Sequence, residues 1–248
     1  MKRTLSLLLL ILCGIHYTIV LGNNPEQSIF DSRVGLVDEF MRRFNLEDSP
    51  YDSTEVAVSR IVNLFNAENF TSETDPLYTA AVEFASAAVK SGTILSYTDS
   101  LWYAKAQCIA RYKKEQVSFD LTLKVQPLGR DMYKWSIFKA SGDIFRLSPS
   151  ATGTGFRLMP DDHEVNFMSL HEITSLQTSC ITNYAASDVN IDPTTVFFTM
   201  VYDGQLEIDH VSSLEFIFCQ VPGWRFTVRH FDRESTNSGW LIDTILKL

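Results

Sequence analysis

The stretch that decides the fold is Ser118-Phe119-Asp120-Leu121-Thr122-Leu123-Lys124-Val125-Gln126. Apolar and polar side chains alternate along it, which is the two-residue period of a β-strand with one buried face and one solvated face. The same period recurs over 104–112 and, after a turn, over 133–137. Neighbouring strands that each have one apolar face predict an antiparallel sheet that helices cover on that face.

Three amphipathic helices are predicted before this sheet. Apolar residues over 30–45 recur at helical spacing and form one stripe. Asp52 and Glu55 have the spacing of a capping box and start a second helix. Asp75-Pro76 combines a cap with a proline in the first turn of a third helix, which Gly92 ends. These helices are expected to cover the apolar face of the sheet.

A second block of helix and strands follows a linker at 148–155, which reads Ser-Pro-Ser-Ala-Thr-Gly-Thr-Gly. Asp161 and Glu164 start a long helix that runs to about Ala186 with one broad apolar face. Strand alternation then resumes over 196–202, before an Asp203-Gly204 hairpin turn, and again over 214–218, 224–228 and 240–242. The predicted fold class is therefore α+β, with N-terminal helices packed on curved antiparallel sheets.

Two ways of dividing the chain stay open. Residues 23–147 form a first half of helices and sheet and residues 156–248 a second, either as separate domains or as one continuous domain. Each half has an alternating strand, a turn and a following strand that contains a tryptophan, Trp135 or Trp224. An internal duplication is one explanation of this similarity between the halves. The other is that any two antiparallel meanders share alternation and a turn.

The order of these elements resembles the NTF2-like (cystatin-like cone) superfamily. The late strand at Trp224 and the closing segment Gly239-Trp240-Leu241-Ile242 carry the resemblance, and the strings at 37–45 and 64–66 resemble exported proteins of Gram-negative gut bacteria. The resemblance implies a pocket between the sheet and the helices. It implies no single activity, since that scaffold carries both enzymes and non-catalytic binding modules.

Residues 1–22 have the order of a secretory signal peptide. Lys2-Arg3 is followed by an apolar run over 5–12 and by small or tolerated residues up to Gly22. The other interpretations are an uncleaved membrane anchor and a lipoprotein signal at Cys13. The expected location is outside the cytoplasm, either secreted or in the periplasm and cell envelope, with no transmembrane segment after cleavage.

Composition and motif spacing exclude several chemistries. The formal net charge is −9 at pH 7, and an acidic surface repels phosphate backbones, so no nucleic-acid partner is expected. Cys108, Cys180 and Cys219 permit at most one disulfide, and the spacing does not decide whether one forms. His163-Glu164 and His171-Glu172 come nearest to a metal motif, but Glu164 and His171 lie two helical turns apart. No metal, cofactor or catalytic residue is therefore predicted.

Five aromatic residues are the candidate ligand-binding positions. Tyr112, Tyr133 and Tyr202 fall on the predicted inward register and can donate a hydrogen bond, while Trp135 and Trp224 offer flat surfaces. The first functional hypothesis is an exported non-catalytic module that binds an unknown small molecule or envelope protein. The alternatives are an NTF2-like enzyme of the isomerase or hydratase type, with a buried acid or tyrosine in its cavity, and a structural component of a surface assembly.

The leader generates a direct prediction. The small or tolerated residues that precede the expected cleavage site end at Gly22. N-terminal sequencing of the exported protein should therefore begin at Asn23. A chain that still begins at Met1 in the membrane fraction would instead favour the uncleaved anchor.

Overall fold

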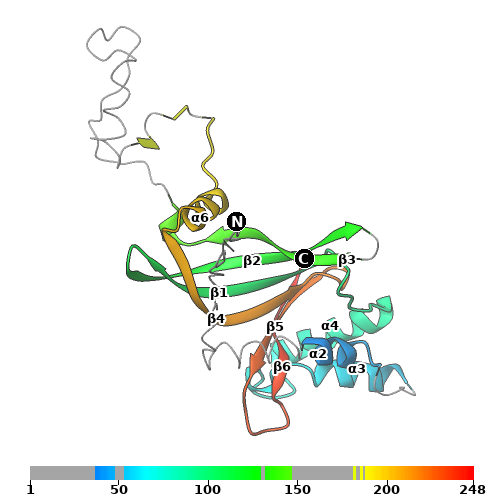
Figure 1. Cartoon of the computed structure of the whole chain (residues 1–248). Coiled ribbons are helices and arrows are strands. Elements are labelled where there is room, and N and C mark those ends of the chain that lie inside the picture. The colour runs from blue at the N-terminus through cyan, green and yellow to red at the C-terminus, as the bar shows by residue number, and fades with distance from the viewer. Residues whose placement is uncertain (1–36, 48–52, 130–131, 147–180, 183–184, 187) are drawn as a thin grey trace, which may run out of the picture.

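The computed structural model describes residues 37–47, 53–129, 132–146, 181–182, 185–186 and 188–248. Within them, six strands form one open sheet in the order β3-β2-β1-β4-β5-β6, and every neighbouring pair is antiparallel (Figure 1). The strands are β1 (Trp102–Tyr112), β2 (Glu115–Gly129), β3 (Met132–Ser141), β4 (Leu206–Phe218), β5 (Trp224–Phe231) and β6 (Gly239–Lys247). The α+β class is confirmed, and the two predicted blocks of strands meet in a single sheet.

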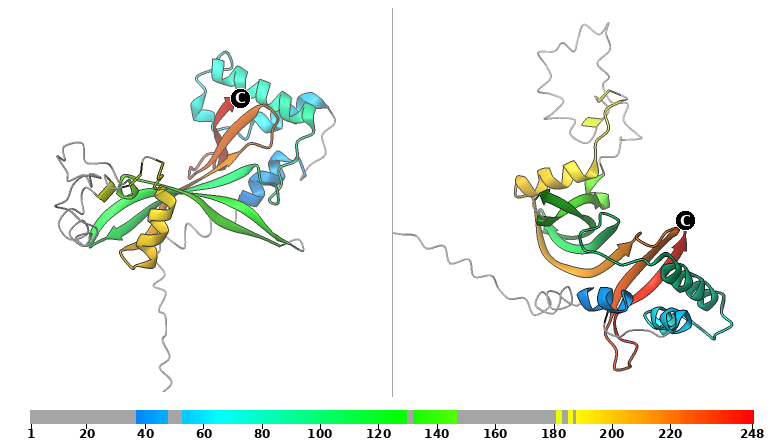
Figure 2. Two further views of the ribbon diagram at one scale, coloured as in Figure 1. Left: turned by 90° about the horizontal axis from the view of Figure 1, so that it is seen from above. Right: turned by 90° about the vertical axis from the view of Figure 1, so that its right-hand side faces the viewer.

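The β1–β4 pair joins the two blocks at the centre of the sheet. One meander runs outward from β1 through β2 to β3, and another runs outward from β4 through β5 to β6. Strand β4 has extra residues at Asp209 and Ser212, where its register with β1 shifts. Such bulges bend a strand and increase its twist, and β4 is visibly curved in Figures 1 and 2.

Three helices precede the sheet, namely α2 (Val37–Phe44), α3 (Thr54–Val62) and α4 (Pro76–Ser91). Helix α3 is capped by Ser53, whose Oγ accepts a hydrogen bond from the N–H of Val56. The capping box predicted from Asp52 and Glu55 is therefore wrong by one residue at the cap.

The predicted ends of α4 are confirmed. The Asp75 carboxylate accepts a hydrogen bond from the N–H of Leu77, and Pro76 occupies the first turn. Gly92 ends the helix with a φ of 61°, a left-handed conformation that glycine adopts without steric cost.

Helix α6 (Pro193–Tyr202) corrects the strand predicted over 196–202. The Asp192 carboxylate accepts a hydrogen bond from the N–H of Thr195, and Pro193 lies in the first turn, so the segment has a complete helix start. Most of its side chains are apolar, so the apolar pattern is compatible with both the helical and the strand period. The capping residue is what distinguishes a helix from a strand here. The Asp203-Gly204 turn consequently leads from a helix into β4.

The larger hydrophobic core lies between helices α2–α4 and the β4–β6 side of the sheet (Figure 2). Phe84 of α4 is completely buried at its centre, with its ring centroid 5.1 Å from that of Phe226 and 5.6 Å from that of Trp224. Phe44 of α2 stacks on Phe226 at 5.7 Å. These aromatic contacts attach the N-terminal helices to β5.

A second core lies on the same face of the sheet, under α6. Phe197 of α6 contacts Phe119 of β2 and Phe145, at centroid distances of 5.8 and 5.7 Å. Alternate residues of β1 connect the two cores, because Ala104 belongs to the first and Ala106 to the second. The sheet thus has one continuous apolar face with helices at both ends.

Some predicted features lie outside the described residues, and they stay predictions. They are the leader at 1–22, the linker at 148–155 with the division into halves that it marks, most of the helix at 161–186, and the His163-Glu164 and His171-Glu172 pairs. Among the residues that the structure does describe, no helix has the length and apolar content that a membrane crossing requires.

Replacing Phe84 with alanine tests the first core. Loss of a completely buried ring leaves a cavity, so the free energy of unfolding should fall by about 3–5 kcal/mol. The matched control is Leu77→Ala on the same helix, where the side chain is about half exposed and the change should stay within about 0.5 kcal/mol. Urea denaturation followed by tryptophan fluorescence measures both. Equal losses in the two variants would show that α4 does not pack on the sheet as described.

Candidate functional site

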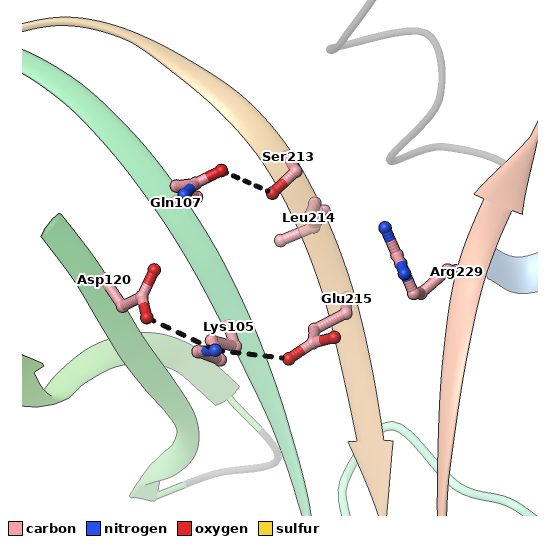
Figure 3. A pocket seen from close by; sticks show the side chains of 7 residues that line it. All are labelled: Lys105, Gln107, Asp120, Ser213, Leu214, Glu215 and Arg229. Carbon is pink, nitrogen blue, oxygen red and sulfur yellow. Dashed lines mark hydrogen bonds and ion pairs between the residues drawn. The ribbon is translucent and has the colours of Figure 1, made fainter. Parts of the chain in front are cut away.

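A polar hollow lies on the face of the sheet opposite to the two cores. Its volume is about 230 Å³, and it is lined by Lys105, Gln107, Asp120, Ser213, Leu214, Glu215 and Arg229 (Figure 3). These residues come from β1, β2, β4 and β5, so the hollow crosses the β1–β4 junction. The polar side chains point outward because the two-residue period of the strands sends their apolar neighbours into the cores.

Lys105 is at the centre of this hollow. Its Nζ lies 3.2 Å from Oδ2 of Asp120 and 3.6 Å from Oε1 of Glu215, which come from the strands on either side (Figure 3). Burial lowers the pKa of Lys105, but the two carboxylates together outweigh burial, and the pKa is raised from its ordinary value. One positive charge therefore links β2, β1 and β4.

The other polar groups of the hollow also have partners. Nη1 of Arg229 lies 3.4 Å from Oδ2 of Asp243, and Arg229 is paired with Glu215 across the β4–β5 ladder. The hydroxyl of Ser213 donates to Oε1 of Gln107 at 3.3 Å. A charged ligand would have to displace one of these internal partners. The hollow is therefore better explained as a cross-strand polar network than as a ligand site.

Three exposed aromatic rings lie on the opposite face, beside the first core. Tyr97, Tyr133 and Trp135 are 39%, 42% and 40% exposed, and together they are called the aromatic surface below. Trp135 meets the buried ring of Trp102 edge-on at 4.7 Å, and Tyr97 meets the same ring at 5.5 Å. Tyr133 lies two residues before Trp135 on the same face of β3. The buried indole thus supports two of the three exposed rings.

Tyr97 is anchored by two hydrogen bonds as well. Its backbone carbonyl accepts one from Nε1 of Trp102 at 3.2 Å, and its hydroxyl donates one to the carboxylate of Asp38 in α2. Burial, then the hydrogen bond and the negative charge of Asp38, raise the pKa of Tyr97 above its ordinary value. The phenol therefore remains a hydrogen-bond donor at neutral pH, and the ring is held at both ends.

The β2–β3 hairpin exposes further apolar side chains. Leu128, Met132 and Phe138 are each about half exposed. Phe138 is the extra residue of a bulge in β3 and lies on the outer face, with Tyr103 beside it and Nζ of Lys124 4.6 Å from its ring centroid. Single exposed apolar side chains are ordinary, and these three lie on the same hairpin as the exposed Tyr133 and Trp135.

The structure brings together two of the five predicted ligand-binding residues, Tyr133 and Trp135. Tyr112 lies at the end of β1 and is partly buried against the second core. Trp224 is buried in the first core. Tyr202 ends α6 and is 91% exposed, so the inward register predicted for it is wrong because the segment is a helix.

Tyr97 is the residue of the aromatic surface that sequence reasoning missed. It lies in the loop between α4 and β1, where the side chains follow no regular period. Its position depends on contacts with Trp102 and with Asp38, which is far away in the sequence. No local signal indicates either contact.

The described cysteines are free thiols, and Cys180 lies outside the described residues. Burial is the first cause that raises the pKa of Cys108, to about 11, and it raises the pKa of Cys219 as well. Both are therefore protonated at neutral pH and are poor nucleophiles in that state. Within the part of the chain that the structure describes, no group of three or more His, Cys, Asp or Glu residues is placed to hold a metal ion.

No family model, no curated protein and no solved structure matches this chain. The function is therefore inferred from these surfaces.

Replacing Lys105 with methionine tests the polar network. A lysine whose pKa is raised in the folded state stabilises the protein fully below its unfolded pKa of about 10.4, and loses this effect as the pH rises through the folded value. We expect Lys105→Met to lower the free energy of unfolding near neutral pH by at most about 1 kcal/mol, because 40% of the side chain is exposed and solvent screens both pairs.

The difference between wild type and Lys105→Met should shrink once the pH exceeds about 10.4. Urea denaturation at neutral and alkaline pH measures it, with the exposed Lys90→Met on α4 as the control. A difference that stays constant with pH would show that the ion pairs do not cause it.

Proposed function

We propose that this chain is an exported, non-catalytic module that binds a partner protein through the aromatic surface of Tyr97, Tyr133 and Trp135. The observation that supports this most strongly is the packing of the exposed Trp135 on the buried Trp102. A ring that is already held in place loses little conformational freedom when a partner covers it. Tryptophan and tyrosine are also the residues that contribute most of the binding energy in many protein interfaces.

A protein partner fits the aromatic surface better than a small ligand does. Tyr133 and Trp135 lie on an open hairpin, Tyr97 lies in the loop before β1, and Leu128 and Met132 add exposed apolar area on the same hairpin. Small-molecule sites are usually concave and enclose most of the ligand. The hollow around Lys105 is polar and lies on the other face of the sheet.

Export and an NTF2-like arrangement belong to the same proposal. The signal-peptide pattern at 1–22 supports export. N-terminal helices that pack on one face of an antiparallel sheet support the NTF2-like arrangement. An exported chain meets its partners outside the cytoplasm, so the proposed partner is a protein of the cell envelope.

Selection of peptides from a displayed random library on the purified protein tests the binding role. Enriched peptides should lose at least about tenfold in affinity for a Tyr133→Ala/Trp135→Ala variant, because a central aromatic contact contributes about 2 kcal/mol or more. Isothermal titration calorimetry measures the affinities, and circular dichroism checks that the variant is folded.

Tyr202→Ala is the matched control, since it removes an exposed aromatic ring outside the aromatic surface. Its affinity for the same peptides should stay within about twofold of wild type. Unchanged binding by the double variant, or the absence of any enriched peptide, would contradict the proposed function.

A further inference from the structure

The two edge strands of the sheet, β3 and β6, differ in what covers their backbones. At β6 the N–H of Ile242 donates to the carbonyl of Leu64, and the carbonyl of Ile242 accepts from the N–H of Asn66, at 2.8 and 2.9 Å. The side chains of Asn69 and Arg43 donate to two further β6 carbonyls, at 2.7 and 3.2 Å. The connection after α3 thus satisfies much of the β6 edge.

The β3 edge has a contact of this kind at its C-terminal end, where the N–H of Ala140 donates to Oγ1 of Thr194 in α6 at 3.2 Å. The bulge at Phe138 lies just before it. Over 132–137, none of the described residues forms a backbone hydrogen bond with the outer side of the strand. Unpaired N–H and C=O groups along an edge strand are a template for pairing with another strand.

Strand β3 is basic in an acidic protein. The net charge of the chain is −9, yet β3 carries Lys134 and Lys139 and no acid. Among the described residues, neither Lys134 nor Lys139 has an ion-pair partner, whereas Lys105 has two. A second copy of β3 placed alongside would bring like charges together, and edge lysines discourage such self-pairing. These charges favour a strand that carries acidic residues.

The two faces of β3 differ in chemistry. Tyr133 and Trp135 are paired with Pro127 and Val125 of β2 and share the core side of the sheet, whereas Lys134 is paired with Gln126 on the outer side. Side chains of adjacent strands are neighbours when they lie on the same face. A strand added to β3 would therefore place its side chains alternately beside aromatic rings and beside a lysine.

We propose that the β3 edge binds an extended segment of a partner protein in which acidic and large apolar residues alternate. The segment pairs with 132–137 as an added strand, with its apolar side chains against Tyr133 and Trp135 and its carboxylates near Lys134. Backbone hydrogen bonds provide affinity in this mode, and the alternation fixes which face of the segment meets each face of the sheet. This inference rests on the proposed function and adds the chemistry of the partner.

The probe is a synthetic peptide of about eight residues, close to the usual length of a strand, in which glutamate and valine alternate. It should bind the full chain more tightly than the same peptide with lysine in place of glutamate. Lys134→Glu should weaken binding of the glutamate peptide by up to about fivefold, the effect of an exposed ion pair, and strengthen binding of the lysine peptide. Lys90→Glu on α4 is the matched charge change, and its affinities should stay within about twofold of wild type.

N-methylation of alternate residues of the glutamate peptide tests backbone pairing. Every second residue of an added strand directs its N–H toward β3. Methylating that set should lower the affinity at least about tenfold, and methylating the other set should change it little. Equal effects of the two sets, or no effect of Lys134→Glu, would overturn the proposal.

Hydrogen exchange identifies the occupant of the edge. The amides of 132–137 that point away from β2 should exchange quickly in the free chain and slowly with the glutamate peptide, whereas those bonded to β2 should be slow in both. Slow exchange of the outward-pointing amides in the free chain would assign the edge to residues of the chain outside the described ones, and a dimer that the peptide does not dissociate would assign it to a second copy. Either result overturns the proposal. Library peptides that depend on Trp135 but show no preference for acids would overturn it and leave the proposed function standing.

Discussion

The rest of the structure depends on the pairing of β1 with β4. It joins the two meanders, and the inward side chains of β1 contribute to both cores, Trp102 and Ala104 to the first and Ala106 and Cys108 to the second. On the outer face of the same junction, Lys105 bridges the strands on either side. Apolar burial on one face and ion pairing on the other therefore act on the same pair of strands. Both helical layers pack against the sheet that this β1–β4 pair holds together.

Small side chains on β1 make this junction compatible with two aromatic cores. Between Trp102 and Tyr112, its inward residues are alanines and one cysteine, all buried. Short side chains on a central strand leave space for rings from its neighbours, such as Phe216 of β4 and Phe119 of β2. Protein interiors are close-packed, so larger residues on β1 would displace these rings. The run of small residues at 104–110 is thus a packing requirement of the aromatic strands beside it.

The strands could be predicted from the sequence because their signal is local. Alternation over 118–126 falls within β2, and the cap and proline at Asp75-Pro76 start α4 as expected. At 196–202 the alternation is misleading because apolar side chains fill most positions, and the Asp192 cap is the better indicator. The β1–β4 pairing and the place of Tyr97 depend on residues far apart in the chain, so no local pattern predicts them. The candidate site was accordingly predicted in part, as Tyr133 and Trp135.

The difference between the two edges of the sheet follows from its strand order. Helices α2–α4 pack at the β4–β6 end, so the connection between α3 and α4 can pair with β6, while α6 reaches only the end of β3. The charges follow the same division. In the hollow, Lys105 and Arg229 are neutralised by acids of neighbouring strands, whereas Lys134 has no ion pair with a described residue. Charge neutralised within the fold holds strands together, and charge that is not neutralised remains able to attract a partner.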